Sequence, residues 1–134
     1  MVYYLKYYRK ENIKYSEYNT IRLNKLETVG FCYYVCGELK IPMVRVAFRK
    51  MKNLGLFNEK NKKVTFQNKN NISLLTVAHE LGHYLDVHRN GSYELGYNYL
   101  YGKKKYRKAH TKKHEQCLKM ILKIYDNIKG GYIG

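Results

Sequence analysis

The sequence has few residues that cross-link or stiffen a chain: three cysteines, one proline and no tryptophan. The cysteines, Cys32, Cys36 and Cys117, form an odd and sparse set, which excludes the disulfide framework typical of small secreted proteins. Cys32 and Cys36 have a spacing that a metal can use, but we interpret both as small buried hydrophobic residues of a reduced protein.

Long apolar runs are also missing. No uninterrupted apolar segment reaches the roughly 18 residues that a membrane-spanning helix needs, which excludes a membrane span. Residues 1–10 mix tyrosine with basic residues and contain no apolar stretch typical of a secretory signal. We therefore expect a cytoplasmic protein that does not contact membranes.

Acidic residues are scarce, because 10 Asp and Glu stand against 26 Lys and Arg, for a formal net charge of +16. A surface of this charge attracts polyanions. The basic residues are densest at Lys60–Lys63, Lys103–Lys105 and Lys112–Lys113. The chain is also rich in Tyr, Asn and Lys, residues that A/T-rich codons favour, so coding bias explains part of the charge. We favour a solvated basic surface with weak electrostatic nucleic-acid contact over a dedicated nucleic-acid site.

The chain of 134 residues contains 45% hydrophobic residues, enough for one folded core and too little length for two. It has no repeat, no low-complexity tract and no Pro/Gly-rich linker, so residues 1–134 are expected to form a single domain.

The first half of the chain predicts strands. Residues Phe31–Val35 and Val44–Phe48 have strand-like patterns. Leu54–Phe57 and Lys63–Gln67, separated by a polar turn, indicate a hairpin. The polar run Asn68–Asn71 then interrupts the pattern and offers side chains that can cap a helix.

The second half predicts helices. Residues 72–88 place apolar side chains on one side of a helix and polar ones on the other. The apolar side holds Leu74, Val77, Ala78, Leu81 and Leu85, and the polar side holds His79, His83 and Asp86. A final helix is expected from Thr111, a plausible cap, to Asn127, before Gly130 and Gly131. Strands followed by helices predict an α+β fold.

The segment between these two helices is harder to interpret. The Tyr/Gly-rich residues 93–102 fit either a loop or a short helix. Gly82, inside the first helix, costs about 1 kcal/mol relative to alanine, so we expect it to permit close approach of another backbone, such as a neighbouring strand.

Residues His79–His83 spell His-Glu-x-x-His, the pattern of zinc-dependent hydrolases. Histidines four apart on a helix lie on one face, about 5–6 Å from each other, and can bind one metal ion. Glu80 lies about 100° further round the helix, beside the metal, where a carboxylate can take a proton from a water molecule. The pattern therefore predicts Zn²⁺ held by His79 and His83, with Glu80 as general base.

A catalytic zinc usually has a third protein ligand. His88 points away from the other two histidines if the helix continues, and nothing in the sequence favours Glu94 or His110. His114 falls within the apolar stripe of the final helix and Glu115 falls at its margin. Helical geometry alone slightly favours His114 and leaves both candidates open.

These residues resemble a known family. Gly55–Phe57, Lys63–Phe66 and Thr76–Leu85 are similar to the core of the ImmA/IrrE-like metallopeptidases of phages and mobile elements. The resemblance covers about half the chain. It implies a small zincin-like (gluzincin-like) domain, in which a short antiparallel sheet or hairpin packs on the motif helix and a C-terminal helix.

The third ligand of that family is a glutamate that opens a later helix and precedes a small residue. This implies Glu115 as the ligand, with Cys117 in place of the small residue. The SprT-like proteases use the same motif with a third histidine, which implies His114. We favour Glu115, with His114 as the alternative.

Asp86 lies one turn beyond His83, where its carboxylate can accept the ring N–H of a ligand histidine. An exposed aspartate or one paired with lysine explains it equally well. Tyrosines between residues 93 and 101 could donate to a developing oxyanion, but the sequence singles out none of them.

The pattern favours a zinc endopeptidase that acts on an extended segment paired with the edge of strand Lys63–Gln67. The family resemblance implies a protein substrate such as a DNA-bound transcriptional repressor. Two alternatives remain: an inactive metal-binding interaction module, and a basic nucleic-acid-binding protein with a structural zinc.

Overall fold

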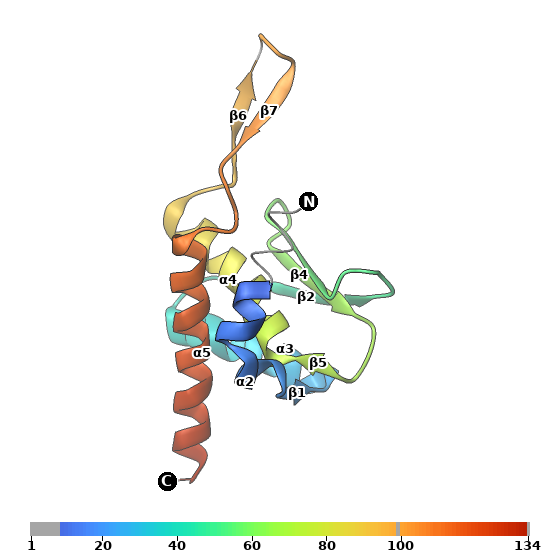
Figure 1. The fold of residues 1–134 in the computed structure, drawn as a ribbon, viewed down its shortest axis with the longest axis vertical. Coiled ribbons are helices and arrows are strands. Elements are labelled where there is room, and N and C mark those ends of the chain that lie inside the picture. Colours follow the sequence, from blue (N-terminus) through green and yellow to red (C-terminus); the bar gives the residue numbers. More distant parts are fainter. Residues whose placement is uncertain (1–8, 99, 134) are drawn as a thin grey trace.

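The fold is a small mixed α+β domain, as predicted. The computed structural model describes residues 9–98 and 100–133, and all structural statements below refer to these. A helix at residues 9–14 comes first. It is followed by α2 (Ser16–Asn19), β1 (Arg22–Leu23), α3 (Lys25–Leu39), β2 (Arg45–Arg49), β3 (Gly55–Asn58), β4 (Lys63–Gln67), β5 (Ile72–Ser73), α4 (Leu74–Asn90), β6 (Glu94–Asn98), β7 (Lys103–Tyr106) and α5 (Lys112–Ile133) (Figure 1).

Helix α3 replaces the strand that we predicted at Phe31–Val35, so that prediction is wrong. A capping box starts the helix, because Asn24 Oδ1 accepts from the backbone N–H of Glu27 and the Glu27 carboxylate accepts from the N–H of Asn24. Five residues with helical spacing are buried: Thr28, Phe31, Cys32, Val35 and Cys36. A local run of aromatic residues suggested a strand, but the longer helical period decides the structure.

The largest sheet has three strands in the order β2–β4–β3. Strands β3 and β4 form the predicted antiparallel hairpin, with Gly55 opposite Phe66, while β2 pairs parallel to β4. Strand β4 is therefore central and has no open edge, contrary to our expectation. Among the described residues, the edge left open beside α4 belongs to β3.

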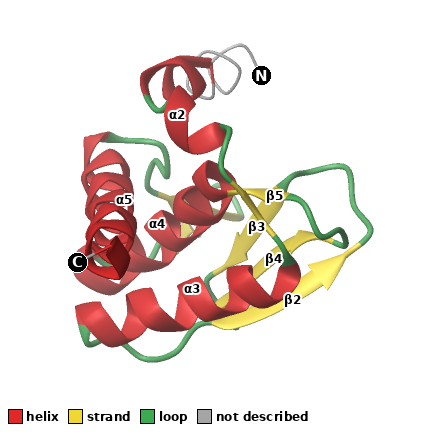
Figure 2. Cartoon of the chain, turned by 90° about the horizontal axis from the view of Figure 1, so that it is seen from below, coloured by secondary structure: helices red, strands yellow, loops and turns green. Residues whose placement is uncertain are grey.

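Helix α4 confirms the predicted motif helix. Its N-cap is Ser73, whose hydroxyl accepts from the N–H of Thr76, and not one of the asparagines at 68–71. Figure 2 shows α4 between α5 and the sheet, and both its apolar and its polar sides are buried. The motif therefore lies inside the domain.

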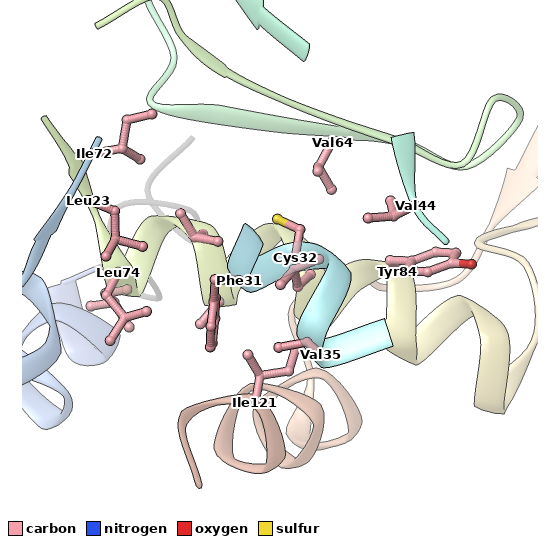
Figure 3. Packing of buried hydrophobic residues seen from close by; sticks show 14 of the residues in the cluster. Leu23, Phe31, Cys32, Val35, Val44, Val64, Ile72, Leu74, Tyr84 and Ile121 are labelled. Carbon is pink, nitrogen blue, oxygen red and sulfur yellow. The ribbon is translucent and has the colours of Figure 1, made fainter. Parts of the chain in front are cut away.

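The core joins α3, α4 and α5 to the three-stranded sheet (Figure 3). Cys32 and Cys36 are completely buried in it, and Cys117 is buried nearby; all three are free thiols, as expected. Burial raises the pKa of the Cys32 thiol well above its ordinary value. These cysteines pack as small apolar side chains.

The Tyr/Gly-rich segment is neither a loop nor a short helix but a two-stranded antiparallel hairpin, β6–β7, that projects from the domain (Figure 1). Gly102, at the turn, has a φ of 62°, which favours glycine.

Helix α5 begins where expected, but it continues through Gly130 and Gly131, which were predicted to end it. The Thr111 hydroxyl has no hydrogen-bond partner among the described residues, so its side chain does not act as the predicted cap. None of the described helices is both long enough and apolar enough to cross a bilayer.

Candidate metal centre

The two histidines of the motif meet inside the domain. Helix α4 places His79 and His83 one turn apart on its buried side, with 3% and 7% of their surfaces exposed. Their Nε2 atoms are 3.1 Å apart. Two zinc-bound nitrogens in tetrahedral geometry lie about 3.3–3.4 Å apart, so this pair already has nearly the required separation.

A third histidine comes from the first turn of α5. His114 is completely buried, and its ring centroid lies 4.6 Å from that of His79 and 4.0 Å from that of His83. One ligand atom from each of the three histidines lies within 4.8 Å of the others. These residues form a group that could hold a metal ion. The His83 and His114 rings are stacked at 19°, so both can bind the same ion only after one ring tilts.

Gly82 allows α5 to approach this closely. A Cβ atom at residue 82 would lie 3.0 Å from Nε2 of His114 and 3.5 Å from the backbone nitrogen of Leu118. The expected close approach at Gly82 is therefore present, but the neighbour is α5 and not a strand.

Glu115, the ligand that we favoured, is not part of this group. Its carboxylate is 2.6 Å from both Lys14 Nζ and the Tyr15 hydroxyl, and these hydrogen bonds, that of Lys14 first, lower its pKa. One position along a helix turns a side chain by about 100°, which directs His114 inward and Glu115 toward the N-terminal segment. Geometry therefore selects His114, the alternative, as the candidate third ligand.

Glu11 supports His79 in a way that the sequence did not indicate. This buried carboxylate lies 2.8 Å from the Nδ1 atom of His79. Since a carboxylate accepts hydrogen bonds, the tautomer that fits carries the proton on Nδ1 and the lone pair on Nε2. Glu11 therefore orients the ring as a second-layer carboxylate orients a metal-binding histidine.

His83 is supported through a tyrosine. The Tyr93 hydroxyl donates to Asp86 at 2.9 Å and lies 2.8 Å from Nδ1 of His83, whose N–H it can accept. Asp86 also accepts from Asn90 and Arg107. Burial opposes its ionisation, but these hydrogen bonds hold its pKa below the ordinary value. Asp86 thus acts on His83 through Tyr93, not by the direct contact that we expected.

The third histidine uses a backbone acceptor. Nε2 of His114 lies 2.9 Å from the carbonyl oxygen of His79, which fixes the proton on Nε2 and the lone pair on Nδ1. Burial lowers the pKa of His79 and His114 to about 4, and burial and neighbouring imidazoles lower that of His83 well below 6.5. All three rings are therefore neutral at pH 7, the form that binds metals.

Glu80 is buried beside these histidines, against strand β3. A Cβ atom at residue 55 would lie 2.8 Å from Cγ of Glu80, so only glycine fits opposite this carboxylate. Burial, followed by the charge of Glu11, raises the pKa of Glu80 to about 8. A nearby cation would favour the ionised form and restore its basic character.

His110, which nothing in the sequence favoured, also lies at the site. It is buried, with its ring centroid 5.3 Å from that of His79 and 5.0 Å from that of His83. Burial, followed by the nearby imidazoles, lowers its pKa to about 4. His88 and Glu94 take no part in the group of three.

The centre opens into a cleft of about 820 Å³. Strand β3 forms one wall of the cleft, and His79, Glu80, His83 and His110 line it together with Tyr93. A substrate in this cleft would therefore meet the histidines, the carboxylate and the open edge of β3 at once.

No family model, no curated protein and no solved structure matches the chain.

Proposed function

We propose that this protein is a zinc-dependent endopeptidase of the ImmA/IrrE-like type. The observation that carries the proposal is the convergence of His79, His83 and His114 beside the buried Glu80 in a cleft. Each histidine has one ring nitrogen directed at an oxygen atom, which orients the other as a ligand.

The donor set suits zinc. Three neutral imidazoles are a known catalytic zinc set, and they leave a coordination position for water or substrate. Zinc in such a site polarises a carbonyl group and lowers the pKa of water toward 7. The same geometry is the basis for proposing a zincin-like fold.

Glu80 would act as the general base. Its carboxylate takes a proton from the attacking water and passes it to the amine that leaves when the peptide bond breaks. The apolar surroundings that raise its pKa also exclude bulk water from the reaction.

Strand β3 would position the substrate. An extended peptide can pair with its open edge by β-augmentation, and Gly55 lets that backbone approach Glu80 without a side chain between them. Only segments that can adopt an extended conformation would fit. The family resemblance favours a transcriptional repressor as the substrate.

A structural metal site is the second candidate, and His110 is the observation that favours it. A fourth protein ligand closes a structural zinc site, and His110 lies beside two of the three histidines. Replacing His110 with alanine separates the two candidates. Zinc affinity should change little in an open catalytic site and fall steeply in a closed one.

The main experiment compares Glu80→Gln with Glu38→Gln, an exposed control on α3. We expect both variants to bind one zinc per chain, measured by elemental analysis after purification. Cleavage of an unfolded protein substrate should disappear only in Glu80→Gln. Cleavage that survives in Glu80→Gln, or a wild-type protein that binds no stoichiometric metal, contradicts the proposal.

A further inference from the structure

The β6–β7 hairpin stands apart from the rest of the domain. Its two strands pair only with each other, and it projects beyond the end of α4 (Figure 1). A two-stranded hairpin that packs on nothing is only marginally stable in water, so its retention requires another explanation.

The hairpin is basic. Five Lys or Arg residues and one acidic residue lie between positions 93 and 108. Lys103, Lys104 and Lys105 are consecutive and exposed. Lys104 pairs with Glu94 at 3.5 Å, but Lys103 and Lys105 form no ion pair within the described part of the chain. Alternation along a strand places Lys103 and Lys105 on the same face, so their charges point together into solvent.

Large side chains are exposed on the same hairpin. Leu95, Tyr97, Leu100, Tyr101 and Tyr106 are between 47% and 90% exposed. Exposed apolar and aromatic side chains grouped in this way mark interaction surfaces. Interleaved with lysines, they match surfaces that hold phosphates by charge and pack against sugars or bases.

The attachment of the hairpin is firm although its tip is exposed. The Glu59 carboxylate accepts from the backbone N–H groups of Tyr93 and Glu94, which fixes one leg to the β3–β4 turn. Arg107 fixes the other leg by donating to Asp86 and to the carbonyl oxygen of Gly91. The same turn carries the exposed Lys60 and Lys62, so it adds further positive charge beside the base of the hairpin.

We propose that the β6–β7 hairpin is a nucleic-acid-binding arm whose exposed lysines contact phosphates. A two-stranded ribbon fits the major groove of duplex DNA, which is about 12 Å wide. The firm base allows the arm to hold its orientation while its tip contacts the ligand. This inference is independent of the endopeptidase proposal, because it involves no residue of the metal centre.

The test compares two double variants of equal charge. Lys103→Gln with Lys105→Gln alters the hairpin, and Lys123→Gln with Lys129→Gln alters exposed lysines near the other end of α5. Binding to a fluorescent 20-base-pair duplex, and to a single strand of the same length, is measured by anisotropy at several salt concentrations. Circular dichroism checks that both variants remain folded.

We expect the hairpin variant to bind about tenfold more weakly or worse near 0.1 M salt, and to lose about two units from the slope of log K against log salt. The control variant should bind like the wild type. A preference for the duplex or the single strand identifies the source of the phosphates. Equal losses in the two variants, or no binding by the wild type, overturn the proposal.

Discussion

Gly82→Ala tests whether the packing of α5 on α4 sets the metal centre. A methyl group at this position would lie 3.0 Å from Nε2 of His114, whereas ordinary van der Waals contact begins near 3.4 Å. The ring must therefore retreat by about 0.4 Å. Metal–ligand distances tolerate only about 0.2 Å, so the shift should weaken metal binding by tenfold or more.

The stability of the metal-free variant should change less than its affinity. Alanine gains about 1 kcal/mol over glycine in a helix interior, while overpacking costs about 1–3 kcal/mol. The two effects largely offset each other, and we expect a net loss of about 0–2 kcal/mol in the free energy of unfolding. Denaturant unfolding in the presence of a chelator measures this quantity.

Gly30→Ala is the matched control. Gly30 lies in α3, and a Cβ atom there meets nothing within 4 Å. This variant should be more stable by about 0.5–1 kcal/mol and bind zinc like the wild type. Zinc affinity, measured by competition with a chromophoric chelator, decides the matter. Wild-type affinity in Gly82→Ala would refute the reasoning that contact with His114 limits the site.

Three further predictions concern the ligands and their surroundings. His114→Gln should reduce zinc affinity by several orders of magnitude, whereas Glu115→Gln should retain it and lose at most about 1 kcal/mol of stability, because its pair with Lys14 is partly exposed; the reverse order in a zinc titration would restore Glu115 as the ligand. Tyr93→Phe removes the hydroxyl between His83 and Asp86, so affinity should fall about 10–100-fold with the fold intact by circular dichroism, and unchanged affinity would contradict that role. The metal-free protein should be most stable near pH 6.5: below it the unfolded state gains protons that the buried histidines refuse, and above it the unfolded state is freed of protons that Glu11 (pKa about 7) and Glu80 (pKa about 8) retain. Thermal unfolding from pH 4 to pH 9 measures this profile, and zinc should remove the decline above pH 7; a decline that persists with zinc bound would contradict the placement of the ion beside these carboxylates.

The sequence was most informative where one element contained the whole signal. Helix α4 has a regular apolar period and holds His79, Glu80 and His83 at fixed spacing, so its position and the proximity of the histidines could be predicted. The β3–β4 hairpin has a polar turn between two strand-like runs. Helix α3 was missed because five consecutive apolar and aromatic residues hide a helical period that appears only over a longer window.

The remaining parts of the site depend on tertiary packing. Glu11 and Tyr93 reach the histidines from segments that lie 68 and 10 residues away along the chain. No local pattern indicates either contact. His114 did have a signal, since it fell within the apolar stripe of α5, but the family resemblance outweighed it. The choice between His114 and Glu115 depends on a rotation of about 100° that only the docked helix fixes.

The contact between Glu11 and His79, together with that between His114 and His79, has a consequence for biogenesis. The centre unites three stretches that are far apart in the chain, so no fragment ending before α5 presents a complete set of donors. During synthesis, loading of the ion must wait until α5 has emerged and docked. The affinity for the ion then becomes part of the free energy of folding, and a chain deprived of it matures more slowly.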